Sequence, residues 1–101
     1  MNTYPVEKAR KSNMKHRPIG IGVQGLADVF ALFKTEWGSP KATYLNQTIS
    51  EAIYYASLDE SCKLAQAHEP YAYFSGSPAS KGILQYDMWG VTPLTLTSSD
   101  V

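Results

Sequence analysis

The chain has 101 residues, a length that suits one small domain or part of a larger one. Nine Lys and Arg residues balance nine Asp and Glu residues, so the formal net charge is zero and nothing in it indicates a nucleic-acid-binding surface. The hydrophobic fraction of 44% is ordinary for a globular interior, and no apolar run approaches the roughly 18 residues of a membrane span. We therefore expect neither nucleic acid nor a membrane among the partners of this chain.

Cysteine usage indicates the cellular compartment. The sequence has one cysteine, Cys62, which excludes an internal disulfide and a metal site built from several cysteines. Sparse cysteine is typical of a reducing compartment. The N-terminal residues, MNTYPVEKARK, lack the apolar run of a signal peptide. The chain is therefore expected to be cytoplasmic.

The first part of the chain predicts two helices separated by an extended segment. Pro5 suits the first turn of a helix over residues 6–13. The basic residues near its end are typical of a solvated surface: Lys11, Lys15, His16 and Arg17. Residues 19–23 predict a short extended segment, after which four apolar residues recur at helical spacing: Leu26, Val29, Phe30 and Phe33. This spacing predicts about three helical turns, ended by Trp37 and Gly38.

A long helix is predicted over residues 40–68. Ser39 suits the N-cap position and Pro40 the first turn, while Glu69 and Pro70 end the helix. Its apolar residues form two stripes on roughly opposite sides. One stripe holds Leu45, Ile49, Ala52, Ile53 and Ala56, and the other holds Tyr44, Tyr55, Leu58, Cys62 and Ala65. Since a helix of a lone small domain usually shows one stripe, two stripes predict packing on two sides within a larger protein.

Beyond the long helix the predicted elements are short. The aromatic residues 71–74 suggest an extended segment, and Ser77 with Pro78 suggests the start of a short helix. Residues 94–101, LTLTSSDV, form a polar tail with few apolar anchors, which we expect to be disordered.

Three glycines, Gly20, Gly22 and Gly25, match the G-x-G-x-x-G pattern of dinucleotide-binding loops. In that fold the pattern follows an apolar strand, opens a helix, and precedes by about 20 residues an acidic residue that binds the ribose. Here the largely polar residues 13–17 precede the pattern, and residues 43–47 contain no acidic residue. The missing context favours a tight corner in which glycine allows close approach of a neighbour, with a small nucleotide-binding domain as the alternative.

No set of side chains predicts a catalytic, cofactor-binding or metal site. Cys62 lies mid-helix on an apolar stripe, which predicts a small buried hydrophobe, because a catalytic thiolate needs a helix N-terminus or a cationic neighbour. His16 and His68 are far apart in sequence, so no metal site is predicted. The other candidates on the long helix are interpreted as ordinary charges or boundary aromatic residues: Glu51, Asp59, Glu60, Tyr54 and Tyr55.

Several runs of the sequence resemble one known family in a single register. The longest are residues 12–28, SNMKHRPIGIGVQGLAD, and residues 76–89, GSPASKGILQYDMW. Shorter runs are residues 2–6, 52–56, 61–65 and 70–71. Together they resemble the large, catalytic subunit of eukaryotic-type class I ribonucleotide reductases, over about residues 2–93.

The resemblance implies reduction of ribonucleoside diphosphates to deoxyribonucleoside diphosphates, which supplies DNA precursors. In the family, a thiyl radical on the large subunit abstracts a substrate hydrogen and a cysteine pair supplies the electrons. The radical originates in a metal-containing small subunit, and the family fold is an α/β barrel. This chain would supply one barrel strand near residues 19–23 with helices outside it. We therefore expect a piece of that barrel that is mainly α-helical, with one or two short strands.

The resemblance carries over no catalytic, cofactor-binding or metal-binding residue. The family's radical cysteine, redox pair and effector sites correspond to segments before this one, and its phosphate-binding turn and C-terminal cysteines to segments after it. Cys62 aligns with none of the working cysteines. We therefore expect residues 1–93 to be part of the barrel domain of a longer protein, and residues 94–101 to be an unmatched tail.

Activity and partners are expected of the complete protein only. The resemblance implies allosteric ATP or dNTP, ribonucleoside diphosphates, a small subunit with a metal-radical centre, and a second large subunit. The chain alone is expected to bind no cofactor and to be inactive. The alternative, from a different class of function, is a non-enzymatic piece that binds the intact reductase subunits.

Overall fold

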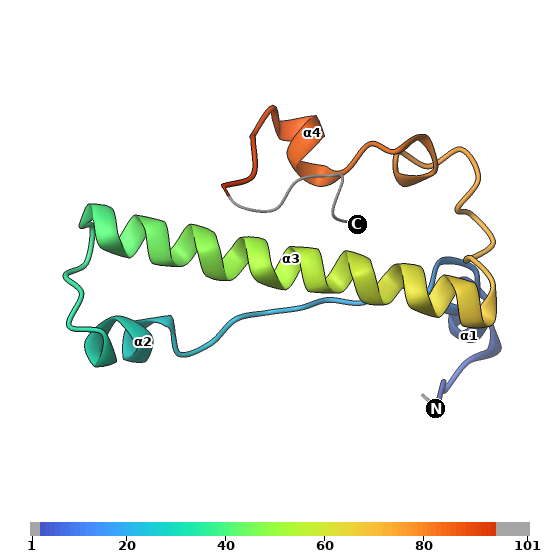
Figure 1. Ribbon diagram of the computed structural model, residues 1–101. Coiled ribbons are helices and arrows are strands. Elements are labelled where there is room, and N and C mark those ends of the chain that lie inside the picture. Colours follow the sequence, from blue (N-terminus) through green and yellow to red (C-terminus); the bar gives the residue numbers. More distant parts are fainter. Residues whose placement is uncertain (1–2, 95–101) are drawn as a thin grey trace. The chain divides into compact units, whose positions relative to one another are not determined.

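Helices make up the regular structure of the chain, as a computed structural model shows for residues 3–94 (Figure 1). In chain order they are α1 (Glu7–His16), α2 (Leu26–Leu32), α3 (Pro40–His68), the 3₁₀ turn η1 (Ala79–Lys81) and α4 (Gln85–Trp89). This mainly helical structure confirms the fold class expected for a piece of an α/β barrel.

The chain divides into two units. One comprises residues 1–20 and 62–91, the other residues 21–61 and 92–101, and the boundary falls inside α3. No helix among residues 3–94 is both long and apolar enough to cross a membrane. The predicted disordered tail lies, apart from its first residue, outside the residues that the structure describes.

The longest helix, α3, begins and ends where its flanking residues predict. The Ser39 hydroxyl oxygen accepts a hydrogen bond from the Ala42 N–H at 3.2 Å, which satisfies one of the N–H groups that a helix leaves unpaired at its start. The same hydroxyl donates to the Glu36 carbonyl at 2.6 Å. At the other end, Glu69 takes a left-handed conformation with φ 64°, and Pro70 cannot continue the helix. Both predicted boundaries are confirmed.

A small apolar core forms where α2 turns into α3, in the unit that contains residues 21–61. Phe30 is 3% exposed and packs against Trp37 with ring centroids 4.9 Å apart and planes at 78°, an edge-to-face pair. Ala42, in the first turn of α3, is 4% exposed. Thr35, between the two helices, is also buried. The buried side chains of the described chain all lie around this turn.

Helix α2 is shorter than the spacing of its apolar residues predicts. It has seven residues, after which Lys34 takes a left-handed conformation with φ 48°. The Thr35 N–H donates to the Phe30 carbonyl at 2.8 Å. The Lys34 N–H donates to the Ala31 carbonyl at 3.0 Å, and the two bonds together close the helix as a Schellman motif. The predicted third turn is therefore wrong, because the chain reverses here and brings Trp37 back to Phe30.

Helix α1 continues past its predicted end at residue 13 to His16. Lys15 and His16 suit this last turn, because basic side chains interact favourably with the partial negative charge at a helix C-terminus. Arg17 then takes a left-handed conformation with φ 46°, and its N–H donates to the Asn13 carbonyl at 2.6 Å. None of the ten residues of α1 is buried.

Two segments predicted to be extended do not form strands, and no strand occurs in residues 3–94. Residues 19–23 lie outside any helix (Figure 1), but a strand needs hydrogen bonds to a neighbouring strand, which this part of the chain lacks. Residues 71–74 form a turn, in which the Phe74 N–H donates to the Tyr71 carbonyl at 2.9 Å. The expectation of one or two short strands is therefore not met in the described chain.

The two apolar stripes of α3 are only partly covered by the described chain. Ala42 is the one buried residue of α3, and it belongs to neither stripe. The stripe residues themselves are exposed or half-buried. Large apolar side chains are also exposed elsewhere: Ile19, Leu32, Trp37, Met88 and Trp89 are examples. The predicted packing of α3 on two sides is thus not satisfied within residues 3–94.

Replacing Ser39 with Ala should destabilise the start of α3. The change removes the hydroxyl that accepts the Ala42 N–H, and loss of such a cap typically costs about 0.5–2 kcal/mol. Urea unfolding followed by far-ultraviolet circular dichroism should show a lower midpoint than the unaltered chain. Ser50→Ala, at an exposed position within α3, is the matched control and should keep or raise the midpoint, because Ala favours helix. Equal midpoints for the two variants would show that the cap contributes nothing.

Candidate functional site

The glycine-rich corner lies immediately before α2. Gly25 precedes the first helical residue and has φ 80°, a left-handed conformation that favours glycine. Its carbonyl accepts the Val29 N–H at 3.1 Å. A Cβ atom built on Gly20 or Gly22 would meet no atom within 4 Å. The backbone conformation therefore requires glycine at position 25. The close approach of a neighbour that was expected at Gly20 and Gly22 does not occur in the described chain.

The charges and geometry at this corner do not favour a phosphate group. Helix α2 has seven residues, so few N–H groups align toward a ligand. Asp28 lies in its first turn, with a carboxylate oxygen 3.5 Å from the position that a Gly25 Cβ atom would take. Negative charge at that position repels a phosphate. No strand precedes the corner in residues 3–94, so the dinucleotide hypothesis gains no support from the geometry.

Cys62 is exposed, which contradicts its interpretation as a small buried hydrophobe. It lies in the second half of α3, and its neighbours on the same stripe, Leu58 and Ala65, are half-buried. The interpretation was wrong because the spacing of apolar residues predicts which side of a helix is suited to a partner, but not what covers that side.

The other candidate side chains do not converge on a site. The Glu51 carboxylate accepts the Leu94 N–H at 2.8 Å, a contact within one unit. Tyr54 and Tyr55 are half-buried, as expected of boundary residues. The remaining polar candidates on α3 are exposed or half-buried: Asp59, Glu60 and His68. Within the described chain, no three His, Cys, Asp or Glu side chains gather into a group that could hold a metal ion.

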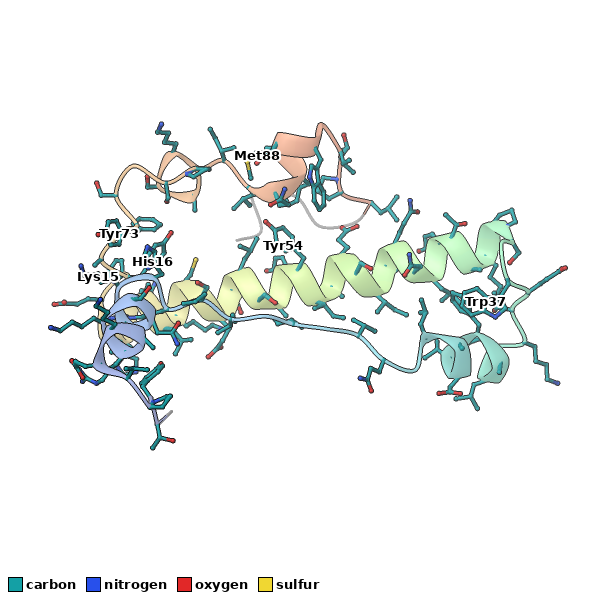
Figure 2. All side chains as sticks on the ribbon, turned by 180° about the vertical axis from the view of Figure 1, so that it is seen from behind. Lys15, His16, Trp37, Tyr54, Tyr73 and Met88 are labelled. Atoms are coloured by element: carbon teal, nitrogen blue, oxygen red, sulfur yellow. The ribbon has the colours of Figure 1, made fainter. Side chains whose placement is uncertain are left out.

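The basic residues at the end of α1 make specific contacts that the sequence interpretation did not foresee. The His16 ring stacks on the Tyr73 ring, with centroids 4.7 Å apart and planes within 4°. The Lys15 ammonium lies 5.9 Å from the centroid of the same ring, within cation–π range. The Arg17 guanidinium donates to the Glu69 carbonyl at 3.0 Å. Figure 2 shows Lys15, His16 and Tyr73 gathered in one place. These exposed side chains are therefore engaged with the turn that follows α3.

A repeated sequence pattern could have indicated this contact. Helix α1 ends in His16-Arg17-Pro18 and α3 ends in His68-Glu69-Pro70, so each helix closes with His, a charged residue and Pro. Arg17 and Glu69 both take left-handed conformations. The contact between the two ends joins the Arg17 guanidinium to the Glu69 backbone carbonyl, so the shared ending of the two helices, and not their opposite charges, is the signal.

The Cys62 thiol should react fully with a water-soluble disulfide reagent in the native chain, because its residue is exposed. The thiolate released can be followed by absorbance, with Cys62→Ala as the blank. The yield without denaturant should equal the yield in urea. Reaction that begins only in urea would show that the thiol is buried.

The chain should show no saturable binding of NAD, FAD or ATP. The glycine corner lacks a preceding strand in the described residues and presents the Asp28 carboxylate to a phosphate. Isothermal calorimetry should give only heats of dilution. Binding tighter than about 100 μM, roughly 5.5 kcal/mol, would contradict this expectation. Asp28→Asn is the informative second variant, because weak binding that appears there would identify the carboxylate as the obstacle.

The chain matches a family of known proteins along nearly its whole length. The family described as "Ribonucleotide reductase, barrel domain" matches residues 1–100. A ribonucleoside-diphosphate reductase large subunit from Caenorhabditis elegans is 60% identical over 93 residues, which are 92% of this chain and 12% of that protein. A large chain from Neurospora crassa is 56% identical over 96 residues, which are 95% of this chain and 10% of that protein.

The match extends to plants, and it covers a small part of each relative. A ribonucleoside-diphosphate reductase large subunit from Arabidopsis thaliana is 58% identical over 93 residues, which are 92% of this chain and 11% of that protein. The chain thus spans about a tenth of the length of the curated relatives it matches. Because the family match takes in all but its last residue, the chain belongs to the ribonucleotide reductase barrel-domain family.

Proposed function

We propose that this chain is a helical segment of the barrel domain of a ribonucleoside-diphosphate reductase large subunit, and that it supplies scaffold rather than reacting groups. The observation that carries the proposal is the incomplete burial of both apolar stripes of α3. A helix of 29 residues with one buried residue leaves apolar surface that other structure must cover. The matched large subunits, of which this chain spans about a tenth, have the additional length that such a cover needs.

The proposed reaction needs more thiols than this chain holds. In the resembled family one cysteine forms a radical, while two others become a disulfide as the substrate is reduced. The chain has one cysteine, Cys62, and it is exposed on α3. One thiol cannot serve both as radical and as reducing pair. We infer that the reacting groups come from other segments of a large subunit.

Cofactors and effectors follow the same argument. The resemblance implies a metal-radical centre in a small subunit, and ATP or dNTP effectors bound by other parts of the large subunit. The Asp28 carboxylate beside Gly25 supports placing the effectors outside the glycine corner, because it repels a phosphate. The complete protein would form a homodimer, bind ribonucleoside diphosphates and act in the cytoplasm to supply DNA precursors.

A second function is favoured by the apolar side chains around the α2–α3 turn. Leu32, Phe33 and Trp37 are 82%, 58% and 66% exposed, and aromatic side chains often dominate protein interfaces. The chain would then be a non-enzymatic piece that binds an intact large or small subunit. A pull-down with each purified subunit separates the two functions. Capture that Leu32→Ser abolishes, at a position too exposed to affect the core, would favour this second function.

The isolated chain should produce no deoxynucleotide. Purified chain is mixed with a radical-bearing small subunit, a reductant and each ribonucleoside diphosphate in turn, and the products are separated by chromatography. The yield should equal that of a blank without the chain, because a single thiol cannot supply both the radical and the dithiol. Product above the blank that Cys62→Ala removes would refute the scaffold proposal.

A chimera tests the positive half of the proposal. The 93 matching residues of the Caenorhabditis elegans large subunit are replaced by those of this chain, and reductase turnover is measured with the small subunit. A scaffold segment of the same barrel should leave the chimera active. Cys62→Ser in the chimera should change turnover little, because the resemblance aligns Cys62 with none of the working cysteines. A modest loss of stability is expected, because covering the stripe buries the new hydroxyl. An inactive chimera that is correctly folded would contradict the proposal.

A further inference from the structure

Helices α1 and α3 end in the same unusual way, within the unit of residues 1–20 and 62–91. Arg17 has φ 46° and Glu69 has φ 64°, both in the left-handed backbone region that residues other than glycine rarely adopt. Each also precedes a proline, which favours extended backbone at the residue before it. A conformation strained in two respects persists where surrounding contacts hold it in place.

The Arg17 side chain joins the two strained positions. Its guanidinium donates to the Glu69 carbonyl at 3.0 Å, across 52 positions of sequence. That carbonyl directly follows the last residue of α3, where partial negative charge accumulates and carbonyls lack helical partners. A guanidinium therefore suits this place both as a donor and as a charge.

A second contact joins His16, the residue before Arg17, to Tyr73, four residues after Glu69. His16 stacks on Tyr73, and the His16 Nδ1 atom lies 3.0 Å from the Ser12 carbonyl, which fixes the orientation of the imidazole. The Lys15 ammonium faces the same Tyr73 ring at 5.9 Å. Figure 2 shows these three labelled side chains meeting. Since Lys15 and Arg17 both face groups of this chain, they favour an internal role over a surface for a polyanion.

We propose that Lys15, His16 and Arg17, with Glu69 and Tyr73, form a clasp that fixes the direction in which the chain leaves α1. The left-handed Arg17 and the restricted φ of Pro18 set that direction locally, and the clasp holds Arg17 in place. The role rests on the proposed function and on the resemblance, which implies that the chain after α1 supplies part of the barrel wall. The clasp residues are positioning residues, and none is assigned a contact with substrate.

The clasp itself is tested by proton NMR of the 101-residue chain, without reference to catalysis. An aromatic ring stacked on the imidazole shifts the His16 ring protons upfield. The shift should be kept in Tyr73→Phe, which retains a ring, and lost in Tyr73→Ala. Arg17→Gly should reduce it, because the guanidinium contact is removed. His16 protons at random-coil positions in the unaltered chain, or unmoved in Tyr73→Ala, would overturn the clasp.

Arg17→Gly in the reductase chimera separates a clasp from an ordinary turn. Glycine accepts the left-handed backbone more readily than Arg but has no guanidinium. If Arg17 is only a turn residue, the variant should be as active as the parent chimera or more so, and this result would refute the positioning role. If the clasp sets the direction in which the chain leaves α1, kcat should fall about tenfold to a hundredfold with KM little changed, as expected for a small misplacement of the barrel wall. Arg17→Lys, which keeps a donor and a charge, should recover part of the loss.

The two experiments allow the proposed function and the clasp to be refuted separately. A parent chimera without activity counts against the proposed function, whereas the NMR shifts still decide whether the clasp exists. A clasp seen by NMR together with full activity of Arg17→Gly refutes the positioning role alone. Loss of the NMR shift in Tyr73→Ala together with loss of kcat in Arg17→Gly supports both steps of the inference.

Discussion

The need to cover two apolar faces of one long helix is the constraint on which the rest of the structure depends. A large apolar side chain gains about 1.5–3 kcal/mol when it is fully buried, while whole domains are stable by about 5–15 kcal/mol. The ten residues of the two α3 stripes are exposed or half-buried in the described chain. Complete burial of the large stripe side chains, most of which are half-buried, would therefore add several kcal/mol, a substantial fraction of the stability of a domain. This magnitude explains why the chain is better understood as part of a larger barrel than as a domain with its own core.

Helix α3 nevertheless has local reasons to form. Its 29 residues contain no glycine and no proline after the first position, and they exceed the roughly 12–15 residues below which isolated helices are marginal in water. Ser39 satisfies an N–H group at the start, and Glu69 with Pro70 stops propagation at the end. Because all of these determinants lie within a few residues of the boundary they set, the bounds of α3 could be predicted from sequence.

Elements that depend on distant residues could not be predicted in this way. Helix α2 ends at Leu32 because Lys34 turns left-handed and lets Trp37 pack on Phe30, and no glycine or proline marks that turn. Residues 19–23 have the composition of a strand, but a strand requires a partner that residues 3–94 do not contain. The exposure of Cys62 could not be predicted for the same reason. Its position on an apolar stripe follows from nearby residues, whereas its burial depends on residues far away in the sequence.

In the candidate sites too, features set by nearby residues could be predicted and features set by distant residues could not. The letters of the glycine pattern suggested a nucleotide, but the decisive features are the conformation of Gly25 and the position of the Asp28 carboxylate, which depend on backbone geometry. The basic end of α1 was interpreted as a solvated surface because its partners, Glu69 and Tyr73, lie more than fifty positions away in the sequence. In the structure Arg17 contacts the Glu69 carbonyl and His16 stacks on Tyr73. Charge clusters therefore need to be compared across helix ends, and not only along one segment. In a chain with so little buried apolar surface, polar and aromatic contacts at the ends of α1 and α3 contribute a larger share of the tertiary order than they would in a domain with a full core.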